Sequence, residues 1–292
     1  MKTPSPRWLL GIDGGGTSCR ARLTDGRGRL LGEGRAGSAN VFSDPDASWR
    51  AIELAGSIAY REAGIDPGER RHTAACLGLA GLDPLDPRAP ADWPLEMFHS
   101  CVVETDALVA LRGAFAGEDG AVLVIGTGSV GFAIVGGRRF AVGGYGALVS
   151  DEGSGNWLGR EAVRQMLWCV DGRQAWSPFT HTLREKLGSS QNTIGWARSA
   201  TPADFARLAP DVLAAASAGD ETATAIVRHG AMLLDGMIAR LARSGAKRIC
   251  LLGGLSISMA SWLEFGDIAV TQPRGDALDG AIRLAGQAIG AG

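Results

Sequence analysis

Short apolar runs alternate with glycine-rich turns at the start of the chain. Residues 7–13 form an apolar run that ends in Asp13, and residues 17–24 alternate apolar with polar side chains, so both segments are predicted strands. The glycine-rich turn at 25–28 leads into a third predicted strand, residues 29–36. The pattern therefore predicts that the chain opens with an antiparallel three-stranded meander.

The same order of elements returns in the second half of the chain. Residues 121–125 predict a strand, residues 126–131 (GTGSVG) a glycine turn, and residues 131–135 and 140–144 two further strands. A repeated order of strand, glycine loop, strand, glycine turn and strand indicates two halves of one duplicated architecture.

The segments that follow each meander differ. A helix is predicted over residues 45–63, because Asp44 can cap its start and Pro45 fits its first position. Buried strands are predicted at 73–81 and 101–105, the second followed directly by a helix. The rest is mostly helical, with helices expected near 154–171, 178–188, 202–217, 220–244 and 276–289 and strands at 248–254 and 266–271.

A polar, glycine-rich segment at 113–120 marks the expected domain boundary. The sequence predicts an α/β protein with a first domain over residues 1–115 and a second over residues 116–275. A chain of 292 residues has room for two domains of about 150 residues each.

Composition narrows the possible functions. Glycine accounts for 43 of the 292 residues, about twice its ordinary share, and gathers at the turns, where backbone must bend sharply or approach a ligand closely. The net charge is −2, with no long basic run, which argues against a nucleic-acid partner. No apolar run reaches the roughly 18 residues of a membrane span, so no membrane partner is expected.

The five cysteines are scattered through apolar stretches and form no CxxC pair. They are Cys19, Cys76, Cys101, Cys169 and Cys250. This pattern is typical of buried free thiols in a reducing compartment, and the N-terminal segment lacks the apolar core of a secretion signal. We therefore expect a cytoplasmic protein without a structural metal.

Three glycine-rich loops follow apolar strands and could bind phosphate groups. Bare backbone N–H groups in tight turns form anion cradles, and Thr17 and Thr127 would add hydroxyl donors. Each loop could also be only a tight hairpin. GTGSVG matches the dinucleotide fingerprint GxGxxG, but a β-pattern follows it where that fingerprint requires a helix. The P-loop pattern is absent as well.

Two aspartates follow predicted strands and are candidates for catalysis. Asp13 abuts the first loop and could hold magnesium, directly or through water, or it could simply form the turn. Asp106 could cap the helix that it begins, or it could act as a general base toward an attacking hydroxyl. The two roles of Asp106 are compatible.

The turn-rich segment 143–159 carries the adjacent acids Asp151 and Glu152 before a helix. Asp151 or Ser154 could cap that helix, or the acids could accept hydrogen bonds from a polyol or amine. Asn40 is a loop amide that could bind sugar hydroxyls.

The motif set resembles a known enzyme family over nearly the whole chain. GIDGGGTSCRARL, GSAN, TDA, IGTGS, GGYG, SDEGS and ICLLGG occur in the order seen in N-acetylglucosamine kinases and bacterial glucosamine kinases. Those enzymes belong to the actin–hexokinase–chaperone ATPase superfamily. The resemblance implies two ribonuclease-H-like domains around a central cleft, and ATP- and magnesium-dependent phosphorylation of an amino sugar at its 6-hydroxyl. It also implies that a C-terminal helix, 276–290, packs back onto the first domain.

The resemblance assigns roles motif by motif. It makes Asp106 the general base, and it implies magnesium, which Asp13 is expected to hold through water because of its place beside the first loop. The residues expected to bind ATP are Asp13, Gly14, Gly15, Gly16, Thr17, Thr127, Gly128, Gly253 and Gly254. The residues expected to bind the sugar are Asn40, Asp106, Ser129, Val130, Gly144, Tyr145, Gly146 and Asp151. The expected partners are a small-molecule sugar and ATP, in a homodimer.

The sequence also departs from the family pattern. Tyr145 stands where relatives often carry Trp, Ser150 where some carry Gly, and Val130 offers only its backbone to a sugar. These departures concern the contacts with the amino or acetamido group at C2 of the sugar, so both glucosamine and N-acetylglucosamine are candidate substrates. The alternative function is an ATPase that activates an acyl-CoA dehydratase or reductase, which needs cysteines to hold an iron–sulfur cluster. No suitably placed cysteine pair is visible in the sequence.

Overall fold

The computed structural model describes residues 6–289, which form two compact units. The first unit contains the described residues up to Val122, the segment Phe132–Ala141 and the described residues from Thr271 onward. The second unit contains Leu123–Gly131 and Val142–Val270. The domain boundaries expected from the sequence stay a prediction, and residue 290 of the expected C-terminal helix lies outside the described residues.

The first unit is built on a five-stranded sheet with the order β3-β2-β1-β4-β5. Its strands are β1 (Trp8–Gly14), β2 (Cys19–Asp25), β3 (Leu30–Ala36), β4 (Thr73–Leu79) and β5 (Ser100–Thr105). β1 and β2 are antiparallel, as are β2 and β3, which confirms the predicted meander. β4 runs parallel to β1, and β5 runs parallel to β4.

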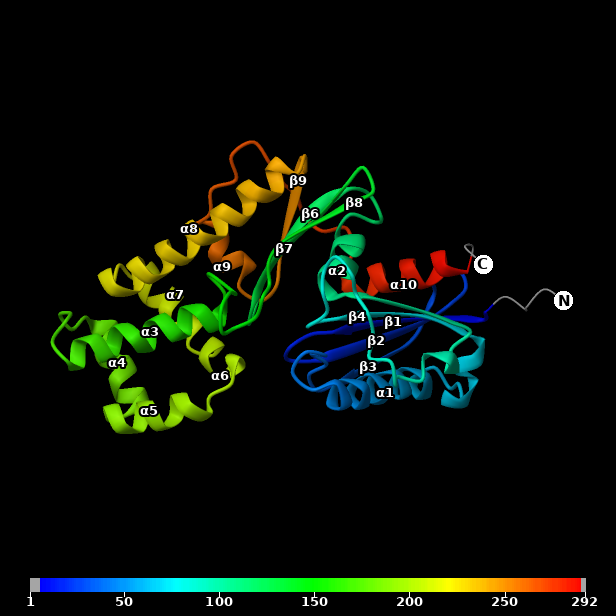
Figure 1. Cartoon of the computed structure of the whole chain (residues 1–292), viewed down its shortest axis with the longest axis horizontal. Coiled ribbons are helices and arrows are strands. Elements are labelled where there is room, and N and C mark those ends of the chain that lie inside the picture. The colour runs from blue at the N-terminus through cyan, green and yellow to red at the C-terminus, as the bar shows by residue number, and fades with distance from the viewer. Residues whose placement is uncertain (1–5, 290–292) are drawn as a thin grey trace. The chain divides into compact units, whose positions relative to one another are not determined.

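Helix α1 (Pro45–Glu62) covers one face of this sheet (Figure 1). Asp44 caps the helix by accepting a 2.8 Å hydrogen bond from the Ala47 N–H, as predicted. The helix lies directly on β3, because a Cβ added at Gly34 would come within 2.0 Å of the Ala55 carbonyl oxygen. A glycine at this position of the strand is therefore required by close packing.

Helices α2 (Asp106–Ala114) and α10 (Ala277–Ala288) pack together on the β1 and β4 strands (Figure 1). Their backbones touch: a Cβ at Gly113 would lie 1.8 Å from the Asp276 carbonyl oxygen, and one at Gly280 would lie 1.9 Å from that of Val109. The apolar cluster beneath α10 includes Leu9, Ala74, Cys76, Ala281 and Ala285.

A second five-stranded sheet has the order β10-β9-β6-β7-β8. Its strands are β6 (Gly120–Ile125), β7 (Ser129–Val135), β8 (Arg138–Gly143), β9 (Arg248–Leu252) and β10 (Ala269–Val270). In both sheets the first strand lies between the second and the fourth in chain order. This shared order confirms the duplicated α/β architecture.

The remaining elements are mainly helices of the second unit. They are α3 (Gly155–Val170), α4 (Pro178–Leu187), α5 (Ser190–Ser199), α6 (Pro202–Ala206), α7 (Ala209–Ser217), α8 (Glu221–Arg243) and α9 (Ser256–Ala260), with short 3₁₀ turns at Pro67–His72 and Leu95–Met97. α5 and α9 were not predicted. The expected single helix over 202–217 is wrong, because it divides at Arg207 and Leu208. Pro210 lies in the first turn of α7 and has no N–H to donate, so a continuous helix would lose a hydrogen bond there.

All five cysteines are free thiols, as predicted, and four of them are buried. None of the helices between residues 6 and 289 is both long and apolar enough to cross a lipid bilayer.

Candidate active site

The first glycine loop is fixed on one side and open on the other. The carbonyl oxygens of Gly14 and Gly15 accept hydrogen bonds from the Ala80 and Ala39 N–H groups, at 2.7 and 3.0 Å. A Cβ at Gly14 would lie within 3 Å of Leu79 and Ala39, whereas one at Gly16 would project into open space. The loop is therefore held firmly by the ends of neighbouring segments, and its free side has room for a ligand.

Asp13 is held by an arginine on the neighbouring strand. The Arg20 guanidinium donates to Asp13 Oδ2 from Nε at 3.0 Å and from Nη2 at 2.6 Å. Both bonds end on the same oxygen, so Oδ1 accepts neither of them. Carboxylate oxygens are the ligands that magnesium prefers, and this geometry suits a carboxylate that holds a magnesium-bound water.

The helix that begins at Asp106 is capped by its neighbour. The Thr105 hydroxyl accepts a 3.1 Å hydrogen bond from the Leu108 N–H, so Thr105 is the N-cap and Asp106 is the first helical residue. The alternative that Asp106 is the cap is therefore wrong. Its carboxylate accepts a 2.8 Å bond from the adjacent Ala107 N–H.

The Asp106 carboxylate has an unusually high affinity for a proton. Desolvation by the surrounding protein raises its pKa to about 6, and the negative charge of Asp13 acts in the same direction. Hydrogen bonds from backbone N–H groups oppose the rise only in part. A carboxyl group with a pKa near the working pH is the usual property of a general base.

The parallel strands of the first unit bring its predicted residues to one edge of the sheet. β1, β4 and β5 run in the same direction, and their carboxyl ends carry the first loop, Ala80 and Asp106. Asn40 pairs with Ala80 in an isolated bridge. This carboxyl edge is where open α/β sheets bind ligands, so Asp13, the loop, Asn40 and Asp106 form one candidate site.

A partly buried ion pair near this edge was not predicted. Arg139 donates two hydrogen bonds to Glu104, one to each carboxylate oxygen, at 2.8 and 2.6 Å. Glu104 lies two residues before Asp106 and is buried. The only sequence signal was an acidic residue in an otherwise apolar strand. The pair braces the end of the strand that leads into Asp106.

The second glycine loop rests on the N-terminus of α3. The N–H groups of Gly155 and Asn156 donate to the carbonyl oxygens of Gly126 and Thr127, at 2.8 and 3.1 Å. Ser154 caps α3 by accepting from the Trp157 N–H at 3.2 Å. Of the two caps considered from the sequence, Ser154 therefore fills the position.

Asp151 is folded in beneath the second loop. Its backbone has a φ of +62°, a strained value for a residue with a side chain. Its carboxylate accepts hydrogen bonds from the Ser129 and Gly146 N–H groups, and a Cβ at Gly128 would lie 2.8 Å from its Oδ2. Burial, with a smaller effect of the Glu152 charge, raises the pKa of Asp151.

The structure therefore gives Ser129 and Asp151 an internal bracing role. The Ser129 hydroxyl donates to the Glu152 carbonyl oxygen at 2.8 Å, and both Ser129 and Asp151 are at least nine-tenths buried. Their predicted contacts with a sugar stay a prediction.

The turn after β8 is shaped by glycines. Gly144 and Gly146 have φ values of +78° and +91°, and a Cβ at Gly144 would lie 2.8 Å from Val130 Cγ2. The Tyr145 side chain is 77% exposed. Val130 thus packs against the turn while Tyr145 points to solvent.

Gly253 and Gly254 differ in their surroundings. Gly253 has a φ of +92°, and a Cβ there would lie 2.4 Å from the Ile125 carbonyl oxygen, which also accepts from the Leu255 N–H at 3.0 Å. A Cβ at Gly254 would meet nothing within 4 Å. Gly253 is thus required for packing beside β6, and Gly254 is free to face a ligand.

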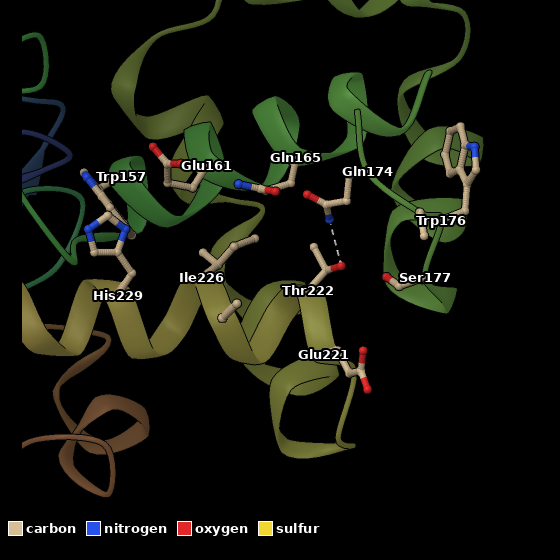
Figure 2. Close-up of a pocket in the computed structure, with 12 residues that line it drawn as sticks. Trp157, Glu161, Gln165, Gln174, Trp176, Ser177, Glu221, Thr222, Ile226 and His229 are labelled. Atoms are coloured by element: carbon tan, nitrogen blue, oxygen red, sulfur yellow. Dashed lines mark hydrogen bonds between the residues drawn. The ribbon is translucent and has the colours of Figure 1, made fainter. Parts of the chain in front are cut away.

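A separate pocket of about 470 Å³ lies in the second unit and contains none of the predicted site residues. Figure 2 shows the rings of Trp157 and His229 at one end and the hydrogen-bonded Gln174 and Thr222 toward the other. Its lining is acidic and carries no lysine or arginine.

Residues 10–282 match the model of the BadF/BadG/BcrA/BcrD ATPase family. The chain belongs to this family. Membership in an ATPase family makes ATP the nucleotide that this chain uses. The match spans both glycine loops, both candidate aspartates and the first half of α10.

The most informative relatives of this family member are sugar kinases. It is 32% identical to the glucosamine kinase GspK of Vibrio cholerae, over 96% of each chain. It is 29% identical to an N-acetyl-D-glucosamine kinase of Dictyostelium discoideum, over 79% of this chain and 77% of that protein. A putative N-acetylglucosamine kinase from Chromobacterium violaceum superposes with a TM-score of 0.83 at 33% identity, covering 97% of this chain and all of that one. These matches confirm the resemblance and the two-domain α/β ATPase fold.

Proposed function

We propose that this protein is an ATP-dependent amino-sugar kinase that phosphorylates glucosamine or N-acetylglucosamine at the 6-hydroxyl. The observation that carries the proposal is Asp106, a carboxylate with a pKa of about 6 at the ligand-binding edge of the sheet. Because Thr105 caps the helix, the Asp106 carboxylate is not needed as the N-cap. The similarity to glucosamine kinase along 96% of the chain supports the choice of sugar.

Asp106 would act as the general base. Above pH 6 its carboxylate is mostly charged and can take the proton of the sugar hydroxyl while that oxygen attacks the γ-phosphorus. The new bond joins the sugar oxygen to phosphorus, the bond between γ-phosphorus and the bridging oxygen breaks, and ADP leaves with its electron pair. Glu104 and Arg139 would keep the strand end that carries Asp106 in position.

The glycine loops suit a polyphosphate chain. We infer that the loop Gly14–Thr17 binds phosphate oxygens on its open side, at Gly16 and Thr17, because the Gly15 N–H already donates to the Ser18 carbonyl oxygen at 2.9 Å. We infer that Thr127 and Gly128 do the same in the second unit. The open space beside Gly16 and Gly254 supports these roles, because a backbone without side chains can approach a phosphate closely. Gly253 would shape the third loop.

Magnesium would neutralise charge on the phosphates and would be held by Asp13 through water. The sugar would contact Asn40 and Asp106 in the first unit. In the second unit the proposed contacts are Ser129, Val130, Gly144, Tyr145, Gly146 and Asp151. Because Ser129 and Asp151 are buried, their proposed contribution is to hold backbone groups toward the sugar.

The cysteines favour the kinase over the alternative role of activator ATPase. An iron–sulfur cluster needs thiolate ligands, which must lose their protons. Burial raises the pKa of Cys19 and Cys101 to about 12, and that of Cys76 well above its ordinary value. An anaerobically purified protein that contained stoichiometric iron would support the activator role instead.

A coupled assay of ADP release tests the proposal. Glucosamine, N-acetylglucosamine, glucose and N-acetylmannosamine are compared by kcat/KM, and the product is identified by NMR. We expect one of the two glucosamine sugars to have the highest kcat/KM and to carry phosphorus on the 6-oxygen. Sugar-independent ATP hydrolysis with no phosphorylated sugar would contradict the proposal. We also propose a cytoplasmic homodimer, which light scattering after gel filtration would test for the oligomeric state.

A further inference from the structure

A cavity of about 650 Å³ lies in the first unit, beneath α10 and beside the β2–β3 turn. Its walls are formed by β2, that turn, the end of α2, the residues just before α10 and α10 itself. Figure 1 shows α10 lying along this side of the sheet. The cavity contains none of the residues assigned above to ATP or to the sugar.

One wall of the cavity carries a buried hydroxyl without a partner. Thr24 is 2% exposed, and its Oγ1 makes no hydrogen bond among the described residues. The pairing of β2 with β3 shifts register between Leu23 and Thr24, an irregularity that re-aims side chains. An unsatisfied buried hydroxyl is costly, so it points to an acceptor supplied from within the cavity.

The cavity is also strongly basic. Four arginines line it: Arg22, Arg27, Arg274 and Arg283. Arg22 is paired with Asp276 and Asp279, and Arg274 is paired with Glu118.

The other two arginines are uncommitted. The guanidinium groups of Arg27 and Arg283 make no ion pair or hydrogen bond with a residue of the described chain. The only acid in the lining, Asp279, is already bound by Arg22 at 2.6 Å. The cavity therefore has two free cationic groups and a hydroxyl donor but no free carboxylate.

The pocket of Figure 2 provides an internal contrast. Glu161 and Glu221 line it, together with amides and aromatic rings, and no cationic side chain does. Its charge would repel an anion, so these two cavities differ in the ligands that they can accept.

We propose that the cavity beneath α10, which we call the arginine cavity, binds a small molecule that carries a phosphate group. Arg27 and Arg283 would pair with the phosphate oxygens, and the Thr24 hydroxyl would donate to one of them. Guanidinium groups are well suited to phosphate because they present several donors in a fixed plane. The volume exceeds that of phosphate alone, which leaves room for a sugar-sized remainder.

Thermal unfolding and calorimetric titration test this site, with inorganic phosphate and glucose 6-phosphate as probes at constant ionic strength. We expect both probes to raise the Tm of the wild-type protein by a few degrees. Arg283→Gln and Thr24→Val should lose most of that rise. Arg50→Gln removes the same charge from the exposed surface of α1 and should retain the rise in Tm. Thr24→Ser keeps the hydroxyl and should retain the rise in Tm as well.

Thr24→Val has a second expected effect, opposite in sign. Without phosphate its Tm should exceed that of the wild type, because an unsatisfied buried hydroxyl is replaced by a methyl group of similar size. Tighter binding of glucose 6-phosphate than of inorganic phosphate would identify a phosphorylated metabolite, and equal binding would identify the free ion. The proposal is overturned if neither probe stabilises the wild type, or if Arg283→Gln and Thr24→Val respond as fully as Arg50→Gln. Neither outcome depends on kinase activity.

Discussion

The two glycine loops come from the same architectural unit, a strand that turns back through glycines, yet their surroundings differ. The first loop follows Asp13 and has open space beside Gly16. The second follows an apolar strand, and Gly128 is pressed against the carboxylate of Asp151. Around the first loop the acids lie at the ligand-binding edge, whereas at the second loop the acid is buried and holds backbone N–H groups.

This difference indicates a division of labour within a duplicated fold. Near the first loop, the Asp106 carboxylate can take a proton and the Asp13 carboxylate can hold a metal-bound water, so both can take part in the reaction. The carboxylate beneath the second loop already accepts backbone hydrogen bonds and is nearly enclosed, so its task is to fix the loop. The same glycine pattern therefore occurs in two environments. Mutations near the first loop should affect activity, and mutations near the second should affect stability.

The largest effect is expected at Asp106. Asp106→Asn removes the general base and should lower kcat by about 10²- to 10⁴-fold while ATP binding remains close to normal. Initial rates and a nucleotide titration measure the two quantities. Asp46→Asn, in the first turn of α1, is the matched control and should leave both unchanged. A near-normal kcat for Asp106→Asn would remove Asp106 from this role.

The next largest effect is expected at Asp13. Asp13→Asn should raise the magnesium concentration needed for half-maximal rate by about 10- to 100-fold, the usual cost of losing a group that holds a metal through an intermediate ligand. Rates measured against magnesium concentration check this. Arg20→Gln removes the partner of Asp13 but keeps its carboxylate, so a smaller change is expected there. An unchanged magnesium requirement in Asp13→Asn would contradict the assignment.

One glycine from each loop tests the difference between them directly. Gly16→Ala adds a methyl group to open space, so stability should change by less than about 0.5 kcal/mol while the KM for ATP rises several-fold. Gly128→Ala places a methyl group against Asp151 and should cost about 1–3 kcal/mol of stability. Thermal unfolding and ATP saturation curves separate the two outcomes. Equal losses of stability would show that the loops are alike after all.

The smallest effect concerns pH. Because the Asp106 pKa is about 6, kcat/KM should fall as the pH drops through 6 and the base becomes protonated. Removing the Asp13 charge lowers this pKa, so the acid limb of Asp13→Asn should lie at lower pH, by less than about one unit. A pH profile of each enzyme measures the shift. A limb that moves upward would contradict the coupling between the two aspartates.

The same pKa has the opposite effect on stability. The folded protein holds the Asp106 proton more tightly than the unfolded chain does, since its pKa is raised from 3.8. The contribution of this group to folding should therefore increase as the pH falls from about 6 toward 4, and it should be absent in Asp106→Asn.

Much of the fold was predictable from local sequence signals. Alternating side chains and glycine turns predicted both meanders, and Asp44 with Pro45 predicted the start of α1. Helix α5 was missed because its sequence, SQNTIGWARS, has little apolar periodicity and buries only Thr193.

The site was predictable in its residues but less so in their roles. Thr105 and Asp106 are adjacent and both can cap a helix, so only the structure decides between them. The pairing of Glu104 with Arg139 depends on tertiary contact between residues 35 apart, which no local pattern encodes. The inward position of Asp151 depends on its left-handed backbone, a conformation that its residue type permits but does not require.

The contact between α2 and α10 has a consequence for how the chain is made. The cluster containing Leu9 and Cys76 is completed by α10, which follows the whole second unit along the chain. During synthesis, that side of the first sheet must therefore remain uncovered while the entire second unit is translated. The glycines at 113 and 280 allow α2 and α10 to touch, so the contact that closes this core can form only after α10 has been translated.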